Sequence, residues 1–258
     1  MSGPVDDADR TPLRRGIPLR ALAPNAVTAL ALCVGLTGVR FAIAGEWEKA
    51  LAAMVMAGVL DGLDGRIARL LKGESRFGAE LDSLSDVIAF GVVPAIVTYL
   101  WALQDLPRFG WVIALAHAVS CALRLARFNA NIDVAEQPHK SAGFLTGVPA
   151  PAGAGLAYLP IYLWLVTGEE ILRAPYVVAP WAGFVAFLMI SNLATYSWSA
   201  LRLRREMRLP AILVVGLVGV ALISEPWITL SIISILYVLS IPFSVRSYAR
   251  VRRQRAAG

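Results

Sequence analysis

The sequence predicts an all-α fold: a polytopic integral membrane helical bundle of about eight transmembrane helices, with both termini cytoplasmic. The chain of 258 residues is 57% hydrophobic and 16% charged, with a mean hydropathy of +0.64. A soluble domain of ordinary composition is less apolar. Apolar runs also recur about every thirty residues, and about 20 helical residues cross a hydrocarbon core. Finally, Lys and Arg are concentrated in alternate connecting segments, as in proteins whose basic loops stay cytoplasmic.

The helices follow from these apolar runs in chain order. The first follows Pro24, the second and third are joined by the short loop KGESRFG, and the fourth ends at the basic pair Arg124 and Arg127. The last two are short and are separated by Glu225-Pro226, where proline cannot continue a helix. The expected spans are residues 25–44, 47–71, 79–103, 111–128, 149–167, 177–199, 210–224 and 226–244.

The charge distribution divides the chain and orients it. Residues 1–23 form a basic N-terminal segment expected to lie on anionic headgroups, residues 24–245 the transmembrane domain, and residues 246–258 a basic C-terminal tail. The sequence pI of about 9.7 fits contact with a membrane surface, because the charge follows the loops and is not gathered on one soluble face. We expect no nucleic-acid partner.

Acidic residues interrupt the second and third spans. Asp61 and Asp64 are one helical turn apart on one face, and Asp82 and Asp86 share a face of the next helix. With a rise of 1.5 Å per residue, Asp61 lies about 15 Å before the end of its helix and Asp86 about 10 Å into the next. Because the two helices form an antiparallel hairpin, all four carboxylates are expected to converge.

Such a cluster needs compensating positive charge. One unpaired Asp near the bilayer centre costs about 2.5–3.5 kcal/mol, so four would cost on the order of 10 kcal/mol. Arg66 points away from the Asp61 face, which leaves Arg69 as the well-placed cation. Oxygen ligands suit Mg²⁺, Mn²⁺ or Ca²⁺, and four carboxylates could hold two such ions about 4 Å apart, an arrangement that commonly clamps phosphates. Gly65, Ala68 and Gly78 leave space beside the acids.

The complete pattern is Asp61, two residues, Asp64-Gly65, two residues, Ala68-Arg69, eight residues, Gly78, three residues, Asp82, three residues, Asp86. It resembles throughout the signature of the CDP-alcohol phosphatidyltransferases, a family of integral membrane enzymes. The resemblance implies a dinuclear metal site and a CDP pocket, with Asp86 also as the catalytic general base. The implied metal ligands are Asp61, Asp64, Asp82 and Asp86, and the implied CDP contacts are Gly65, Ala68, Arg69 and Gly78.

Three further segments, RLARFN (124–129), GFLTGVPAPAGAG (143–155) and MISNLATYSW (189–198), resemble the phosphatidylserine synthase branch of this family. The implied reaction transfers the phosphatidyl group of CDP-diacylglycerol to L-serine and releases CMP. A sister enzyme acting on glycerol 3-phosphate, inositol phosphate or choline is the nearest alternative. An ion-coupled transporter also buries carboxylates, but it needs access from both faces, whereas these acids lie toward one.

Several polar residues outside the signature have two interpretations each. Arg124, Arg127 and Asn129 lie where an anionic acceptor or phosphate would approach, yet they also suit helix-end anchoring. Asn25 and Thr28 suit either a helix start or a nucleotide contact. The resemblance further implies a homodimer in the lipid bilayer, the bacterial inner membrane if the source is bacterial, with the active site facing the cytoplasm.

Three residues inside predicted spans have no expected chemical role. His117 faces an otherwise apolar span, where a satisfied interior side chain is commoner than a ligand. Cys33 and Cys121 are expected to be small buried hydrophobes.

Overall fold

The computed structural model describes residues 19–130, 143–196 and 207–256, and within them it is an all-helical bundle with one small sheet. The short helical segments are η1 (Val87–Val92), η2 (Leu103–Asp105) and η3 (Glu170–Arg173), and the strands are β1 (Phe144–Thr146) and β2 (Ala194–Tyr196). The longer helices are α1 (Leu19–Ile43), α2 (Trp47–Leu70), α3 (Arg76–Asp86), α4 (Val93–Trp101), α5 (Phe109–Ala130), α7 (Ala150–Ala157), α8 (Leu159–Thr167), α9 (Pro175–Ile190), α10 (Arg208–Ser224) and α11 (Pro226–Ala256).

Membrane-spanning character is confirmed by the length and apolarity of these helices. The described residues contain 5 helical runs long and apolar enough to cross a membrane: Leu22–Ile43, Arg76–Trp101, Phe109–Ala130, Ala150–Thr167 and Pro226–Gln254. Helix α2 has 24 residues, sufficient for a crossing, but it carries the first two aspartates. The protein is therefore an integral membrane protein, while the number of crossings stays a prediction.

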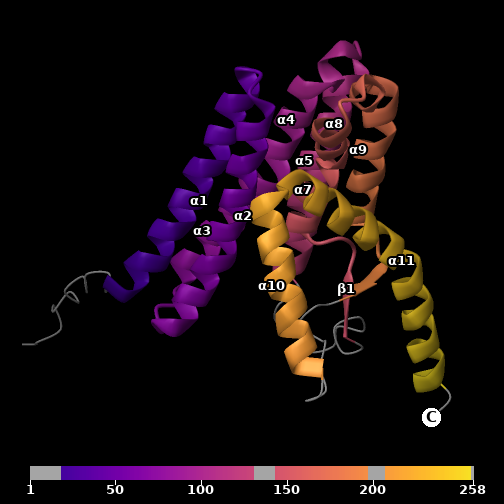
Figure 1. The fold of residues 1–258 in the computed structure, drawn as a ribbon. Helices are drawn as coiled ribbons and strands as arrows, with labels where there is room; N and C mark the ends of the chain where they lie inside the picture. The colour runs from indigo at the N-terminus through magenta and orange to yellow at the C-terminus, as the bar shows by residue number, and fades with distance from the viewer. Residues whose placement is uncertain (1–18, 131–142, 197–206, 257–258) are drawn as a thin grey trace, which may run out of the picture.

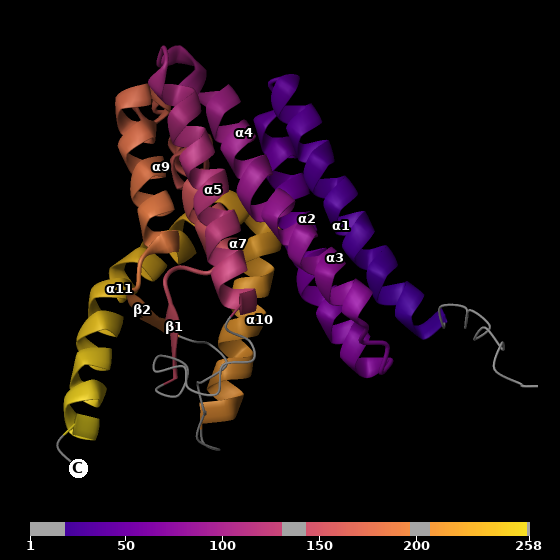
Figure 2. The ribbon, with the colours of Figure 1, turned by 180° about the vertical axis from the view of Figure 1, so that it is seen from behind.

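The two ends of the described chain lie at the same end of the bundle. Figure 1 shows α1 beginning, and α11 ending, at the lower end, where the α2–α3 turn and the strands also lie. The reverse view shows α1, α2 and α3 together on one side, with α5, α7 and α9 beside them (Figure 2). This arrangement agrees with termini on one side of the membrane, and their cytoplasmic location stays a prediction. The predicted boundaries at 23 and 245 fall inside α1 and α11.

The prediction of a helix over 177–199 is wrong at its C-terminal end. Helix α9 ends at Ile190, and Ser191 adopts an extended backbone with φ −64° and ψ 159°. Residues 194–196 then form β2, which pairs antiparallel with β1 in the register Phe144↔Tyr196. The hydroxyl of Ser244 in α11 donates to the Ala194 carbonyl at 2.8 Å. The residues after Ile190 mix polar and apolar side chains (SNLATYSW), and a segment this short does not by itself distinguish a strand from the continuation of a helix.

Two clusters of buried side chains hold the bundle together. One joins α2, α4 and α8 around Leu51, Trp101 and Ile161. The other joins η1, α5 and α9 around Phe90, Cys121 and Met189. Cys121 is thus buried as expected, whereas Cys33 is exposed on α1. Helix α11 continues to Ala256, past residue 244 where the last span is expected to end, and the limit of the span itself stays a prediction.

Candidate metal and nucleotide site

Three of the predicted aspartates form a compact cluster between α2 and α3. One carboxylate oxygen from each of Asp61, Asp64 and Asp82 lies within 4.8 Å of the others. Asp64 is buried, with 4% of its surface exposed, and the other two are partly buried. The expected convergence of the two helices is therefore observed for these residues.

Asp86 lies at the edge of the cluster, against Asp61 and within hydrogen-bonding reach of its side chain. It does not belong to the compact group formed by the other three. Its Oδ1 atom is buried and has no hydrogen-bond partner. The structure thus brings Asp86 to the site and leaves one of its oxygens available to bind a ligand or accept a proton.

The composition of the cluster fits a hard divalent cation. Within the described part of the chain, none of these aspartates forms an ion pair with Lys or Arg, and both Arg66 and Arg69 have exposed side chains. Neighbouring carboxylates at this distance repel one another strongly in a low dielectric. All candidate ligand atoms are carboxylate oxygens, which Mg²⁺, Mn²⁺ and Ca²⁺ prefer. The residues present therefore fit a metal site.

Thr28 of α1 orients the most buried carboxylate. Its hydroxyl donates to Asp64 Oδ2 at 2.5 Å, and the same hydroxyl lies 3.2 Å from the carbonyl oxygen of Pro24. Thr28 itself is 4% exposed. A second residue that holds a ligating carboxylate in place is a recurrent feature of metal sites. From the sequence, Thr28 suits either a helix start or a nucleotide contact, and this bond to Asp64 was not predicted.

A cavity of about 260 Å³ opens beside the cluster. Asp64 and Asp82 line one part of it. Every predicted CDP contact lines it as well: Asn25, Thr28, Gly65, Ala68, Arg69 and Gly78. The structure therefore gathers in one cavity residues from α1, α2 and α3 that are separated by up to about fifty positions in the chain, although their contact with CDP stays a prediction.

The two signature glycines lack a side chain for different structural reasons. A Cβ added to Gly65 would meet no atom within 4 Å, so this residue leaves open space in the cavity. A Cβ added to Gly78 would lie 2.7 Å from Asn25 Oδ1 and 3.1 Å from Ser75 Oγ. Gly78 therefore leaves room for the Asn25 side chain of α1 against the backbone of α3. The expectation that small residues leave room holds for Gly65, and Gly78 serves close packing.

The α2–α3 turn is stabilised by caps at both helix ends. The amides of Lys72 and Gly73 donate to the carbonyls of Arg69 and Ala68 at 3.2 and 2.9 Å, with Lys72 in the left-handed region at φ 49°. This pairing is that of a Schellman motif. Ser75 caps α3 by accepting a hydrogen bond from the Gly78 amide at 3.0 Å. Ser75 also lines the cavity. The sequence signal that could have identified it is a Ser directly before a helix, which is a common N-terminal cap.

The three basic and polar residues at the end of α5 have separate surroundings. Arg127 donates to the carbonyls of Ile190 and Ser191 and to Asn192 Oδ1, at 3.2, 3.3 and 2.9 Å. It therefore binds the C-terminal end of α9, where a cation is favourable. Asn129 donates to Ser83 Oγ at 3.0 Å, next to Asp82 in the chain. Both contacts favour the anchoring interpretation for these residues.

Arg124 is the member of this group that interacts electrostatically with an aspartate of the site. It is partly buried, its Nε atom has no hydrogen-bond partner, and it is close enough to Asp86 and Tyr237 for electrostatic interaction. His139 and Lys140, which precede α7 in the sequence, lie outside the described residues. So does Trp198, the last residue of the segment MISNLATYSW.

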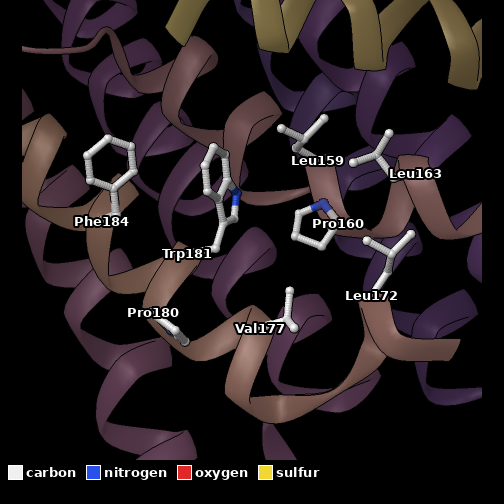
Figure 3. Close-up of a pocket in the computed structure, with 8 residues that line it drawn as sticks. All are labelled: Leu159, Pro160, Leu163, Leu172, Val177, Pro180, Trp181 and Phe184. Atoms are coloured by element: carbon white, nitrogen blue, oxygen red, sulfur yellow. The ribbon is translucent and has the colours of Figure 1, made fainter. Parts of the chain in front are cut away.

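A larger cavity of about 450 Å³ lies between α8 and α9, and none of the four aspartates lines it. Figure 3 shows its lining side chains: Leu159, Pro160, Leu163, Leu172, Val177, Pro180, Trp181 and Phe184. The indole nitrogen of Trp181 already donates to the Leu156 carbonyl at 2.7 Å. This lining therefore offers apolar contact and carries no titratable side chain.

Comparison with known proteins agrees with the chemistry of the cluster. A family model described as CDP-alcohol phosphatidyltransferase matches residues 21–190, and one described as CDP-alcohol phosphatidyltransferase 2 matches residues 206–242. Three similar proteins are each named CDP-diacylglycerol–serine O-phosphatidyltransferase. That of Mycobacterium tuberculosis is 38% identical over 234 residues, covering 91% of this chain and 81% of that protein.

The corresponding protein of Mycobacterium leprae is 36% identical over 234 residues, covering 91% of this chain and 77% of its own. That of Helicobacter pylori is 34% identical over 177 residues, covering 67% of this chain and 70% of that protein. The first family model matches well over half of the chain and includes every signature residue. The chain therefore belongs to the CDP-alcohol phosphatidyltransferase family.

Proposed function

We propose that this membrane enzyme transfers the phosphatidyl group of CDP-diacylglycerol to the hydroxyl of L-serine, producing phosphatidylserine and CMP. The observation that carries the proposal is the cavity that Asp64 and Asp82 line together with all the predicted CDP contacts. The names of the relatives from Mycobacterium and Helicobacter support serine as the acceptor. The relatives cover most of this chain, so the comparison extends beyond the signature.

The CDP moiety would occupy the cavity, with its pyrophosphate toward the aspartates. Gly65 leaves space there, and Arg69 at the same lining brings a guanidinium to the phosphates. Asp61, Asp64, Asp82 and Asp86 would hold two divalent ions, Mg²⁺ or Mn²⁺, with Ca²⁺ as an alternative. When bound, these ions would supply positive charge that neutralises the pyrophosphate and stabilises CMP as a leaving group.

Asp86 is proposed as the general base. Its unpartnered Oδ1 would accept the proton of the serine hydroxyl. The serine oxygen then forms a bond to the lipid-side phosphorus, the bond from that phosphorus to the CMP oxygen breaks, and CMP leaves with the bonding electrons. Arg124, which lies near Asp86, would hold the serine carboxylate next to the base.

The cellular arrangement belongs to the same proposal. We place the active site at the cytoplasmic face, so that the lipid substrate enters from that leaflet and serine from water. The basic segment before residue 24 and the basic tail after residue 245 would contact membrane lipids. A homodimer is part of the proposal, since the resemblance to the family implies one.

The test is an assay with purified protein in detergent, CDP-diacylglycerol, Mn²⁺ or Mg²⁺, and labelled serine. We expect labelled lipid and CMP in equal amounts, and no product from Asp86→Asn. A panel of acceptors, including glycerol 3-phosphate, inositol phosphate and choline, identifies the alcohol. If another acceptor were used at least as well as serine, the proposed substrate would be wrong. An Asp86→Asn variant with most of its activity would disprove the role of the base.

A further inference from the structure

The helix that carries Asp82 and Asp86 changes its geometry directly after Asp86. Val87–Val92 form a π-helical turn, in which the amide of Val93 donates to the carbonyl of Ile88, five residues earlier. The cause lies in Pro94, near the start of α4. Proline has no N–H to donate to the carbonyl four residues earlier, that of Phe90, and its ring crowds that carbonyl. The widened turn relieves this conflict, and such turns occur frequently at functional sites.

The donor that Pro94 cannot supply comes from another helix. His117 of α5 places Nε2 3.3 Å from the Phe90 carbonyl oxygen. Both residues are buried, with 2% and 3% of their surfaces exposed. Because a carbonyl oxygen can only accept, Nε2 carries the proton. The ring's Nδ1 is buried without a partner in the described structure, so the hydrogen bond to Phe90 is the polar contact that holds this ring.

Close packing reinforces the same connection one turn further along α5. A Cβ added to Gly91 would lie 3.0 Å from Cys121 Cβ and 3.4 Å from the Ala118 carbonyl oxygen. His117 and Cys121 are four residues apart and therefore share a face of α5. This face contacts the π turn through one hydrogen bond and one backbone-close contact, at two successive residues, Phe90 and Gly91.

We infer that His117 is a positioning residue for Asp86, acting through the Phe90 carbonyl and the π turn. One residue of an α-helix corresponds to a rotation of about 100°. If the turn relaxed toward regular α geometry while Gly91 stayed packed against α5, Asp86 would rotate about the helix axis, away from Asp61. The effect on catalysis rests on the proposed function. The clamp between α5 and the π turn, meaning the hydrogen bond from His117 to Phe90 and the contact of Cys121 with Gly91, does not depend on that function.

Three substitutions separate the hydrogen bond from simple packing. Gln Nε2 is as many bonds from Cα as His Nε2, so His117→Gln keeps a donor within reach of Phe90. The amide nitrogen of His117→Asn is one bond shorter, and His117→Leu has no donor. We expect the Asn and Leu variants to lose about 10- to 100-fold in kcat, the range for a displacement of about 1 Å at a catalytic group. The KM for CDP-diacylglycerol should change little, and the Gln variant should retain most activity.

Thr98→Val is the matched control, because Thr98 is buried and its hydroxyl has no hydrogen-bond partner. Removing that hydroxyl deletes a buried polar group without breaking a bond, so activity should stay near wild type. If His117→Gln lost as much activity as His117→Leu, or if the Leu variant kept the wild-type kcat, the inference would be overturned. Should the Leu variant fail to fold, the comparison of Gln with Asn decides.

A second measurement does not depend on activity. In a Cys33→Ser background, Cys121 is the remaining cysteine of the chain, and it is buried against Gly91. Labelling with N-ethylmaleimide should be slow in this background and with His117→Gln, and about 10-fold faster with His117→Leu, because labelling requires local opening. Equal labelling rates in all variants would refute the clamp. An unsubstituted enzyme that released no CMP would refute the proposed function and leave the labelling comparison valid.

Discussion

The hydrogen bond from Thr28 to Asp64 makes a prediction about metal affinity. Thr28→Val has nearly the same shape but removes the hydroxyl that donates to Asp64 Oδ2 at 2.5 Å. Both side chains are 4% exposed, so water cannot easily replace the lost donor. Hydrogen bonds to charged groups contribute about 1.5–3 kcal/mol. Since each 1.4 kcal/mol is a factor of ten in an equilibrium constant, losing this bond should weaken metal binding roughly 10- to 150-fold.

The assay is the Mn²⁺ dependence of CMP release at saturating CDP-diacylglycerol and serine. We expect Thr28→Val to need at least about 10-fold more Mn²⁺ for half-maximal activity, the effect typical of residues that support a metal ligand. Thr28→Ser keeps the hydroxyl and is the control, with a dependence close to wild type. If the Val variant were activated at the wild-type Mn²⁺ concentration, Thr28 would not orient a ligand, and the metal assignment of Asp64 would lose its support.

Three other predictions follow from neighbouring contacts. Gly78→Ala places a methyl group 2.7 Å from Asn25 Oδ1, so the KM for CDP-diacylglycerol should rise about 10-fold or more; a KM unchanged in steady-state kinetics would contradict the close approach. Arg127→Met removes the guanidinium from the end of α9. Thermal melting should show a free energy of unfolding lower by about 1–3 kcal/mol, and steady-state kinetics should show little change in the KM for serine. Arg124→Met should do the reverse, raising the KM for serine at an unchanged melting temperature, and a wild-type KM would remove Arg124 from the acceptor site.

The membrane class and the acidic hairpin could be predicted because both depend on local information. Composition and run length decide whether a segment prefers lipid to water. Helical periodicity decides that Asp61 and Asp64 share a face, and a short loop places α3 antiparallel to α2. The cluster of three aspartates is the direct result. The resemblance to the family extended this to the predicted CDP contacts, and the residues so predicted do line one cavity.

Other predictions failed or stayed open because the same residue types occur in two different structural settings. The segment after Ile190 was assigned to a helix, but it contains a strand whose pairing with Phe144–Thr146 depends on a distant part of the chain. Arg127 and Arg124 have the same sequence signal at the end of α5. Only the fold shows that Arg127 binds the end of α9 and that Arg124 is near Asp86.

By itself, the sequence determined that the protein is a helical membrane protein, that its acids gather in one hairpin, and that this hairpin is the family signature. The tertiary structure decided which side chains support those acids. Thr28 reaches Asp64 from α1, and His117 reaches Phe90 from α5. The physical reason is that periodicity specifies neighbours within a helix, whereas a hydrogen bond between helices depends on how whole helices pack, and no local pattern encodes that packing.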